Sequence, residues 1–342
     1  MTELRAGVIG MGKMGLLHSA ILNSLEGVRL TAVADTEKFI TSFFKKNTSN
    51  VQVYDDYKKM IEDAGLDIIY ITTPVSSHVP MASFCAERKI HFFVEKPLGR
   101  DSIECVTLCE AARKSNVISM VGFCLRYLET FSRAKELLDE KVLGDLVNIK
   151  ATVYQSQAVA KGTGWRFKKE ISGGGVLIDL GTHLIDLLLW FFGKIKSVQG
   201  NAQYNYSQVE DTVTANIQFE SSVEASFAAS WNVKNYRLQE TTIEIEGTKG
   251  KMKINEDYLR ISNTQRGAIK EDTFYRQSLY KGVPVDIGGP EYTREDLDFI
   301  NCIRNDKQPM LNVVDASRTQ SVLDSIYKSS KYNSIEVIKY IE

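Results

Sequence analysis

The sequence contains few of the residues that mark metal-binding or disulfide-bonded proteins. Among its 342 residues there are only five cysteines and four histidines. No two cysteines form a Cys-x-x-Cys motif, and no cysteine–histidine pair has zinc-finger spacing. The sequence therefore predicts neither a structural zinc site nor a disulfide framework. Unpaired thiols persist in reducing compartments, so we expect a cytoplasmic protein.

An excess of charge of either sign is also absent. The chain has 42 Lys and Arg against 43 Asp and Glu, which gives a formal net charge of −1. Nucleic acids and anionic membranes attract strongly basic surfaces, so neither is a predicted partner. Every apolar run long enough to span a membrane is interrupted by charged residues, so no transmembrane helix is expected.

What remains is the composition of a globular protein, 43% hydrophobic and 25% charged. A chain of this length exceeds one typical hydrophobic core, so two domains are expected. There is no internal repeat and no low-complexity tract.

The first motif is a strand, a glycine-rich turn and a helix. An apolar strand over 6–9 runs into Gly10-Met11-Gly12-Lys13-Met14-Gly15, and a helical pattern continues through Leu25. A second strand, over 28–34, ends at Asp35, which lies 20 residues after Gly15. In this context G-x-G-x-x-G indicates dinucleotide binding, because the glycines let the backbone and a helix N-terminus approach a pyrophosphate. The alternative is a glycine-rich turn beside a surface aspartate.

The acid at the end of the second strand predicts which dinucleotide is bound. Asp35 can accept hydrogen bonds from both ribose hydroxyls and would repel a 2′-phosphate. Thr36 stands where an arginine could hold that phosphate, which favours NAD. Lys38 could pair with a 2′-phosphate, which is the argument for NADP. The sequence therefore favours NAD over NADP.

Alternating strands and helices continue through residue 123. Further strands are predicted over 67–72, 90–94 and 118–123, with helices over 54–64, 78–88 and 103–114. This alternation predicts an α/β domain over 1–123 with a parallel, doubly wound sheet. Ligands bind at the carboxyl ends of such strands, where Lys96 stands, so this lysine is predicted to face the cofactor crevice. The alternative is a surface lysine, and a cis Lys96–Pro97 bond would fix its direction.

The remainder, 124–342, is predicted to form a substrate-binding and oligomerisation domain of the α+β class. Its sheet is expected to be open and mostly antiparallel, with strands over 146–155, 195–204, 209–219, 223–232, 238–246 and 249–254. Helices are predicted over 131–138, 174–192, 293–304 and 313–330. A sheet face without helices is a usual place for subunits to meet, which predicts a homodimer or homotetramer. Residues 263–290 are predicted to form an active-site loop or an interface arm.

The most informative stretch is the apolar helix over 173–192. It carries Asp179, His183 and Asp186 at spacing i, i+4, i+7, which places them on one stripe of a helix. Polar groups in a buried setting are unfavourable unless paired, and a carboxylate beside an imidazole suits proton transfer. The alternatives are a helix-dipole aspartate with a buried core histidine, or a metal site. A metal site is disfavoured because all three groups come from one helix face, so no metal is predicted.

Together these motifs resemble the Gfo/Idh/MocA oxidoreductases, a family that includes glucose-fructose oxidoreductase and inositol dehydrogenase. The residues that carry the resemblance are G-x-G-x-x-G with His18, Thr73-Pro74 with His78, Glu95-Lys96-Pro97, Gly122-Phe123-x-x-Arg126-Tyr127, and Gly173-Gly174-Gly175 with Asp179, His183 and Asp186. The resemblance covers the whole chain. It implies a Rossmann domain, a C-terminal domain with an open sheet, and hydride transfer between NAD(P) and a secondary hydroxyl of a sugar, nucleotide sugar or cyclitol.

The resemblance also implies roles for individual residues. Lys96 would bind the reacting oxygen and orient the nicotinamide, His183 would be the general base, and Asp179 would hydrogen-bond the substrate. The chemistry agrees, because an ammonium stabilises a developing alkoxide and imidazole accepts a proton near neutrality. Asp186 would orient its neighbours.

Two sets of contacts follow. The implied cofactor-binding residues are Gly10, Gly12, Lys13, Met14, Gly15, Asp35, Thr73, Pro74, His78, Glu95, Lys96 and Cys124. The implied substrate-binding residues are Lys96, Arg126, Tyr154, Trp165, Arg166, Asp179 and His183. Many members have Asn where this chain has Cys124, and a thiol cannot donate a hydrogen bond as an amide does.

Two alternative functions stay open at this point. An NAD-dependent glycosidase would use the same fold with transient oxidation and elimination. A non-enzymatic NAD-binding sensor or co-regulator could dispense with the pair of Lys96 and His183, which this chain has.

Overall fold

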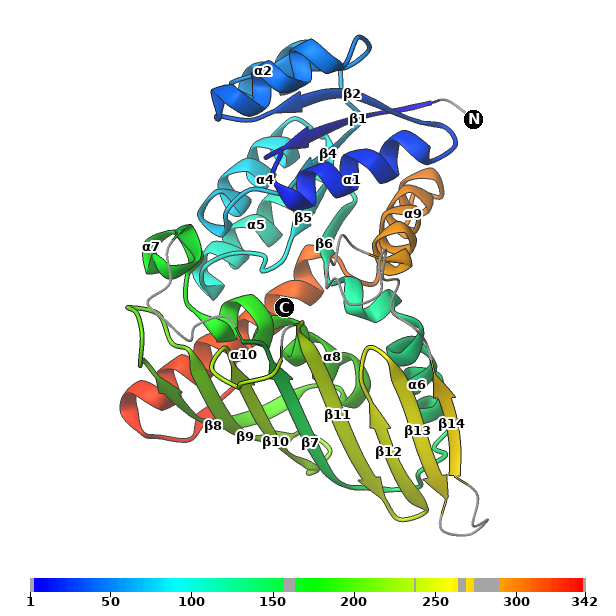
Figure 1. The fold of residues 1–342 in the computed structure, drawn as a ribbon, viewed down its shortest axis with the longest axis vertical. Helices are drawn as coiled ribbons and strands as arrows, with labels where there is room; N and C mark the ends of the chain where they lie inside the picture. Colours follow the sequence, from blue (N-terminus) through cyan, green and yellow to red (C-terminus); the bar gives the residue numbers. More distant parts are fainter. Residues whose placement is uncertain (1–2, 157–163, 237, 264–268, 274–288, 341–342) are drawn as a thin grey trace. The chain divides into compact units, whose positions relative to one another are not determined.

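The computed structural model describes residues 3–156, 164–236, 238–263, 269–273 and 289–340. The chain divides into two units, each described separately below. Unit 1 comprises Met1–Phe123 and Tyr292–Ser317, and unit 2 comprises Cys124–Glu291 and Arg318–Glu342. Figure 1 shows the elements of both.

Unit 1 is built on a six-stranded sheet in which every pair of neighbours is parallel, in the order β3-β2-β1-β4-β5-β6. The strands are β1 (Leu4–Ile9), β2 (Val28–Ala34), β3 (Gln52–Tyr54), β4 (Ile68–Ile71), β5 (His91–Glu95) and β6 (Ser119–Gly122). The helices are α1 (Lys13–Ser24), α2 (Lys38–Asn47), α3 (Tyr57–Asp63), α4 (His78–Glu87), α5 (Ser102–Ser115) and α9 (Pro290–Arg304), with a 3₁₀ turn, η1 (Val75–Ser77). The predicted doubly wound α/β domain is confirmed, and its strand order is that of dinucleotide-binding sheets.

The strands of unit 1 are apolar because helices cover both faces of the sheet. All four residues of β4 are fully buried. Helix α2 was missing from the predicted elements, and its apolar face is only partly buried, with Phe44 in the core. Phe39 is 82% exposed, and Phe43 is exposed as well.

The return of the chain to unit 1 at α9 was not anticipated, because the sequence placed all of 124–342 in the second domain. The helix belongs to unit 1 because its buried face packs there. The Phe299 ring lies 5.9 Å from that of Tyr70 and 6.1 Å from that of Phe93, between centroids. Asp296, also fully buried, hydrogen-bonds His18 of α1.

Unit 2 is built on a nine-stranded sheet in the order β14-β13-β12-β11-β7-β10-β9-β8-β15. Strands β7 and β10 are parallel and all other neighbours are antiparallel, as predicted. The strands are β7 (Leu146–Tyr154), β8 (Ile195–Gln203), β9 (Thr212–Phe219), β10 (Glu224–Ser230), β11 (Glu240–Gly247), β12 (Gly250–Ile254), β13 (Tyr258–Asn263), β14 (Ile269–Thr273) and β15 (Glu336–Val337). Of the predicted loop over 263–290, residues 269–273 form a strand instead, because they pair antiparallel with β13. Positions 264–268 and 274–288 lie outside the described residues.

Helices pack on one face of this sheet, where Figure 1 shows α6, α8 and α10. The helical elements of unit 2 are 3₁₀ turns η2 (Cys124–Tyr127) and η3 (Trp165–Phe167), α6 (Glu129–Asp139), α7 (Lys169–Ser172), the π-helical turn η4 (Leu177–Gly181), α8 (Thr182–Phe192) and, from Arg318 on, α10 (Val313–Tyr332). Alternate residues of β7 point toward the helices, so Ile149, Ala151 and Val153 are buried in one core with the apolar residues of α8.

The helical stretch Lys169–Phe192 is long and apolar enough to cross a membrane by length and composition, with a mean hydropathy of 1.6. However, 78% of its most apolar window is buried inside the protein. The core helix of a folded domain has the same properties, and this stretch fills the core of unit 2.

Candidate active site

Glycine stands at each of the three positions of the first loop for a different structural reason. Gly10 has a φ of +89°, which L side chains rarely adopt. A Cβ on Gly15 would lie 2.0 Å from the carbonyl oxygen of Gly10, so this glycine allows α1 to pack closely against β1. A Cβ on Gly12 would meet no atom of the described residues within 4 Å. The space beside Gly12 is where the dinucleotide motif brings the backbone to a pyrophosphate.

The start of α1 and the end of β2 complete this loop. No side-chain cap and no acidic residue of the described chain occupies the first turn of α1, which leaves N–H groups for an anion. Asp35 accepts the Met11 N–H at 2.6 Å and the Glu37 N–H at 2.8 Å, so it ties the end of β2 to the glycine loop. Its carboxylate oxygens each keep a further lone pair, which suits ribose hydroxyls. These residues fit a bound dinucleotide.

His78 joins the loops that follow β4 and β5. Its Nε2 lies 2.8 Å from the Thr73 carbonyl oxygen, and its Nδ1 lies 2.8 Å from the Pro97 carbonyl oxygen. Burial lowers the pKa of His78. Both ring nitrogens face backbone carbonyl oxygens, and the neutral ring donates a hydrogen bond to one of the two. This structural position was not predicted from the sequence.

Lys96 lies directly after β5, at the edge of the sheet that also carries Asp35 and Thr73. The Lys96–Pro97 bond is cis. The Lys96 N–H donates to Oε2 of Glu95 at 3.1 Å, and the other Glu95 oxygen lies 3.2 Å from Nε2 of His18. The described residues of unit 1 thus bring the predicted cofactor residues of the glycine loop and of the strand ends to one edge of the sheet.

In unit 2, the predicted continuous α-helix is interrupted at the polar stripe. Residues Leu177–Gly181 form a π-helical turn with Asp179 at its centre, and His183 lies in the first turn of α8. A Cβ on Gly181 would lie 2.9 Å from Cδ1 of Leu177, the mobile end of a side chain in the same turn. Single π-helical turns of this kind are frequent at functional sites.

The three polar residues of the stripe reach different depths. The Asp179 side chain is 21% exposed, His183 is buried, and the Asp186 side chain is only 2% exposed. Nε of Arg166 lies 3.9 Å from Oδ1 of Asp179, and its guanidinium lies 4.7 Å from the centre of the Trp165 ring. The structure therefore brings together four of the predicted substrate-binding residues.

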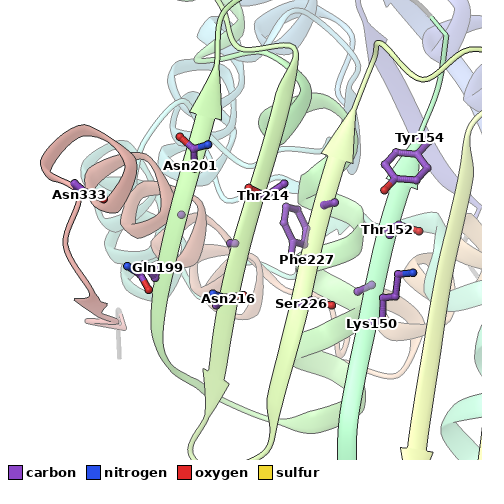
Figure 2. A pocket seen from close by; sticks show the side chains of 14 residues that line it. Lys150, Thr152, Tyr154, Gln199, Asn201, Thr214, Asn216, Ser226, Phe227 and Asn333 are labelled. Atoms are coloured by element: carbon purple, nitrogen blue, oxygen red, sulfur yellow. The ribbon is translucent and has the colours of Figure 1, made fainter.

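Two other predicted substrate contacts are placed differently. Nε and Nη2 of Arg126 donate to the two carboxylate oxygens of Asp186 at 2.8 and 2.6 Å, and both residues are buried. Tyr154 lies on the opposite face of the sheet from α8, because side chains alternate along β7 and Val153 points into the core. Figure 2 shows Tyr154 beside Thr152 and Lys150 on that outer face. Cys124 is buried at the start of η2.

Glu210, which the sequence did not single out, binds the backbone at the start of the helical stretch over 174–192. Oε1 of Glu210 accepts hydrogen bonds from Gly175 N–H at 2.8 Å, Leu177 N–H at 3.0 Å and the Tyr327 hydroxyl at 2.8 Å. Burial raises the pKa of Glu210. A Cβ on Gly175 would lie 1.9 Å from the Glu210 carbonyl oxygen, so only glycine fits this close approach. The adjacent glycines were the one sequence signal for it.

Family models match both units. Residues 4–123 match the oxidoreductase family with an NAD-binding Rossmann fold, and residues 131–253 match the GFO/IDH/MocA C-terminal domain. The chain belongs to the Gfo/Idh/MocA oxidoreductase family. The predicted resemblance is confirmed, and the matched Rossmann fold is NAD-binding. No group of three His, Cys, Asp or Glu side chains among the described residues has the geometry of a metal site.

Several members of the Gfo/Idh/MocA family are similar over most of their length. Levoglucosan dehydrogenase of Pseudarthrobacter phenanthrenivorans is 25% identical over 75% of this chain and 74% of its own. The scyllo-inositol 2-dehydrogenase (NAD(+)) of Bacillus subtilis is 25% identical over 92% of this chain and 90% of its own. A solved structure of levoglucosan dehydrogenase with NADH has a TM-score of 0.88 at 23% identity, covering 99% of this chain and all of that chain. The predicted fold class is thus confirmed for this family member.

Proposed function

We propose that this protein is an NAD-dependent dehydrogenase that oxidises or reduces a secondary hydroxyl of a sugar, nucleotide sugar or cyclitol. The observation that carries the proposal is the partly exposed Asp179 on a π-helical turn, four residues before His183 and beside Arg166. This group occurs in a chain whose other unit has a dinucleotide-binding loop. Relatives named as levoglucosan and inositol dehydrogenases support the substrate class.

Each residue has a defined task in this proposal. The glycine loop and the start of α1 hold the pyrophosphate, and Asp35 binds the adenosine ribose. NAD, when bound, supplies the hydride acceptor. His183 takes the proton from the reacting hydroxyl, and the Lys96 ammonium stabilises the developing alkoxide. Asp179 orients the substrate by a hydrogen bond and balances the charge of the imidazolium.

The test is to follow NADH absorbance with a panel of cyclitols, aldoses and UDP-sugars, using NAD and NADP in parallel. On the substrate that is found, Lys96→Ala and His183→Ala should each lower kcat by about 100-fold or more while NAD still binds. His91→Asn, a change to a histidine outside the site, is the matched control. Near-wild-type turnover by both variants would contradict the assignment. Release of free sugar from a glycoside without net NADH would show a glycosidase instead.

We also propose that subunits meet on the outer face of the nine-stranded sheet. Among the described elements no helix covers this face, and strands β7 to β10 line a shallow cavity of about 470 Å³ there (Figure 2). The exposed Thr214, Asn216 and Ser226 side chains lie on this face. Light scattering after gel filtration should give a homodimer or homotetramer, and Thr214→Lys with Ser226→Lys should dissociate it. A monomeric wild type would refute this interface.

We infer a cytoplasmic, reducing location from the thiols. All five cysteines lie among the described residues as thiols, not as disulfides, and four are buried. The near-neutral charge favours small-molecule partners over nucleic acid or membrane. Cell fractionation would test the location.

A further inference from the structure

His18 is a fully buried histidine held between two carboxylates from distant parts of the chain. Its Nδ1 lies 2.9 Å from each carboxylate oxygen of Asp296 on α9. Its Nε2 lies 3.2 Å from Oε1 of Glu95 at the end of β5. Both ring nitrogens therefore face acceptors, so the doubly protonated imidazolium satisfies every contact.

The surroundings of this histidine are aromatic. The His18 ring lies 4.9 Å from that of Phe93 and 5.4 Å from that of Tyr70, between centroids. Burial by itself lowers the pKa of His18, but the carboxylates of Asp296 and Glu95 outweigh it, and the pKa lies well above its usual value of 6.5. The positive charge of His18 is thus paired on both sides in a site without water access.

The second oxygen of Glu95 continues this series of contacts. Oε2 accepts the backbone N–H of Lys96 at 3.1 Å. Gly122, the partner of Glu95 on β6, leaves room for the carboxyl group, since a Cβ there would lie 3.2 Å from Oε2. Hydrogen bonds therefore run from Asp296 through His18 and Glu95 to the backbone of Lys96.

We propose that His18, held by Asp296, is a positioning residue that fixes Glu95 and through it the backbone of Lys96. The inference rests on the proposed function, because it assumes that Lys96 acts in hydride transfer. His18 lies on α1, one turn after Gly15, so the same helix that starts at the dinucleotide loop also sets the direction of the lysine. His18 is fully buried, so it acts on Lys96 through Glu95.

A purely structural role for His18 predicts loss of stability without a specific loss of rate. The chain offers a matched control in His91, which lies at the start of β5, whereas Glu95 lies at the end of this strand. Nδ1 of His91 accepts the Ile118 N–H at 3.0 Å, so His91→Asn perturbs β5 far from Lys96. Both variants should lower the melting temperature.

The experiment compares His18→Gln, Glu95→Gln, the double variant and His91→Asn in the full-length protein. We expect His18→Gln to lower kcat by about 10- to 100-fold, because small displacements of a catalytic group have effects of this size. The Kd for NAD, measured by titration, should change by less than about threefold. Because His18 acts through Glu95, the double variant should be about as slow as the slower single variant. His91→Asn should keep kcat within about twofold.

Three outcomes would overturn the proposal. One is a kcat of His18→Gln that matches wild type, another is additive effects in the double variant, and the third is an equal loss of kcat in His91→Asn. If His18→Gln fails to fold, Asp296→Asn tests the same contacts with the histidine in place and should give the same fall in kcat. The variant Lys96→Ala distinguishes a failure of the proposed function from a failure of the positioning role. An active Lys96→Ala refutes the role given to Lys96 in the proposed function and this inference with it, whereas an inactive Lys96→Ala beside an unaffected His18→Gln refutes only the positioning role.

Discussion

The substitution Gly12→Ala separates cofactor binding from stability. An added methyl group would meet no atom of the described residues within 4 Å, and the Gly12 backbone (φ −72°, ψ −164°) is one that alanine adopts without strain. The apoprotein should therefore be unchanged or more stable by about 0.4–1 kcal/mol, since alanine restricts the unfolded chain. The methyl group would occupy the space through which the backbone approaches the pyrophosphate. We expect NAD to bind about 100-fold more weakly, or by about 2.8 kcal/mol.

The control for this substitution is Gly15→Ala in the same loop. Its methyl group would lie 2.0 Å from the Gly10 carbonyl oxygen and 2.9 Å from Oγ1 of Thr72. The nearer atom belongs to the backbone and cannot move aside without shifting β1 or α1. We therefore expect Gly15→Ala to destabilise the apoprotein by about 3 kcal/mol, at the upper end of overpacking effects.

Calorimetric titration with NAD and thermal unfolding with and without NAD measure both quantities. NAD at about 100 times its Kd stabilises the wild type by about 2.7 kcal/mol, and this stabilisation should nearly vanish in Gly12→Ala. Two results would refute the reasoning. The first is a destabilised Gly12→Ala apoprotein, and the second is a Gly12→Ala variant that binds NAD as tightly as the wild type.

Three further predictions concern stability. Glu210→Ala should lower the free energy of unfolding, measured by urea denaturation, by about 2–4 kcal/mol, because three donors lose a buried acceptor. Glu210→Gln should lower it less, and an equal loss in both variants would contradict this reasoning. Arg126→Ala should lower the free energy of unfolding by about 3–5 kcal/mol by leaving the buried Asp186 charge without its partner, and replacing both residues by apolar ones of similar size should restore part of the loss. Because the pKa of His18 is raised on folding, its stabilisation is complete below pH 6.5 and is lost as the pH rises through the folded pKa. The difference in unfolding free energy between wild type and His18→Gln should therefore narrow at alkaline pH, and a constant difference would count against an ionised His18.

The elements that could be predicted from the sequence are those marked by motifs or periodicity within one short stretch of the chain. The glycine loop with its flanking strand and helix is such a case, because each glycine acts on atoms within a few residues or on the next strand. The alternation of β7 predicted a half-buried strand, and the helix over 174–192 was indicated by apolar residues around a polar stripe at spacing i, i+4, i+7. The π-helical turn was not predictable from period alone, because Asp179 and His183 share a face in either geometry.

The parts that could not be predicted depend on contacts between distant residues. His18 and Asp296 are 278 positions apart, and no period or spacing connects them. The same holds for Glu210, which is 35 positions from Gly175. Tyr154 was assigned to the substrate site by the family resemblance, but the face of a strand on which a side chain lies depends on register. Alternation along β7 puts Tyr154 on the outer face.

The late position of α9 in the chain has a consequence for synthesis on the ribosome. Unit 1 begins with the first strand but is completed only when Tyr292–Ser317 emerges, about 170 residues after Phe123. At about 5–20 residues per second, this delay is on the order of ten seconds or more. During that time the aromatic surface of Tyr70 and Phe93 has no α9 to cover it, and His18 has no Asp296. The nascent chain therefore exposes an apolar, aromatic surface during synthesis, which is the kind of surface that makes incomplete chains prone to aggregate.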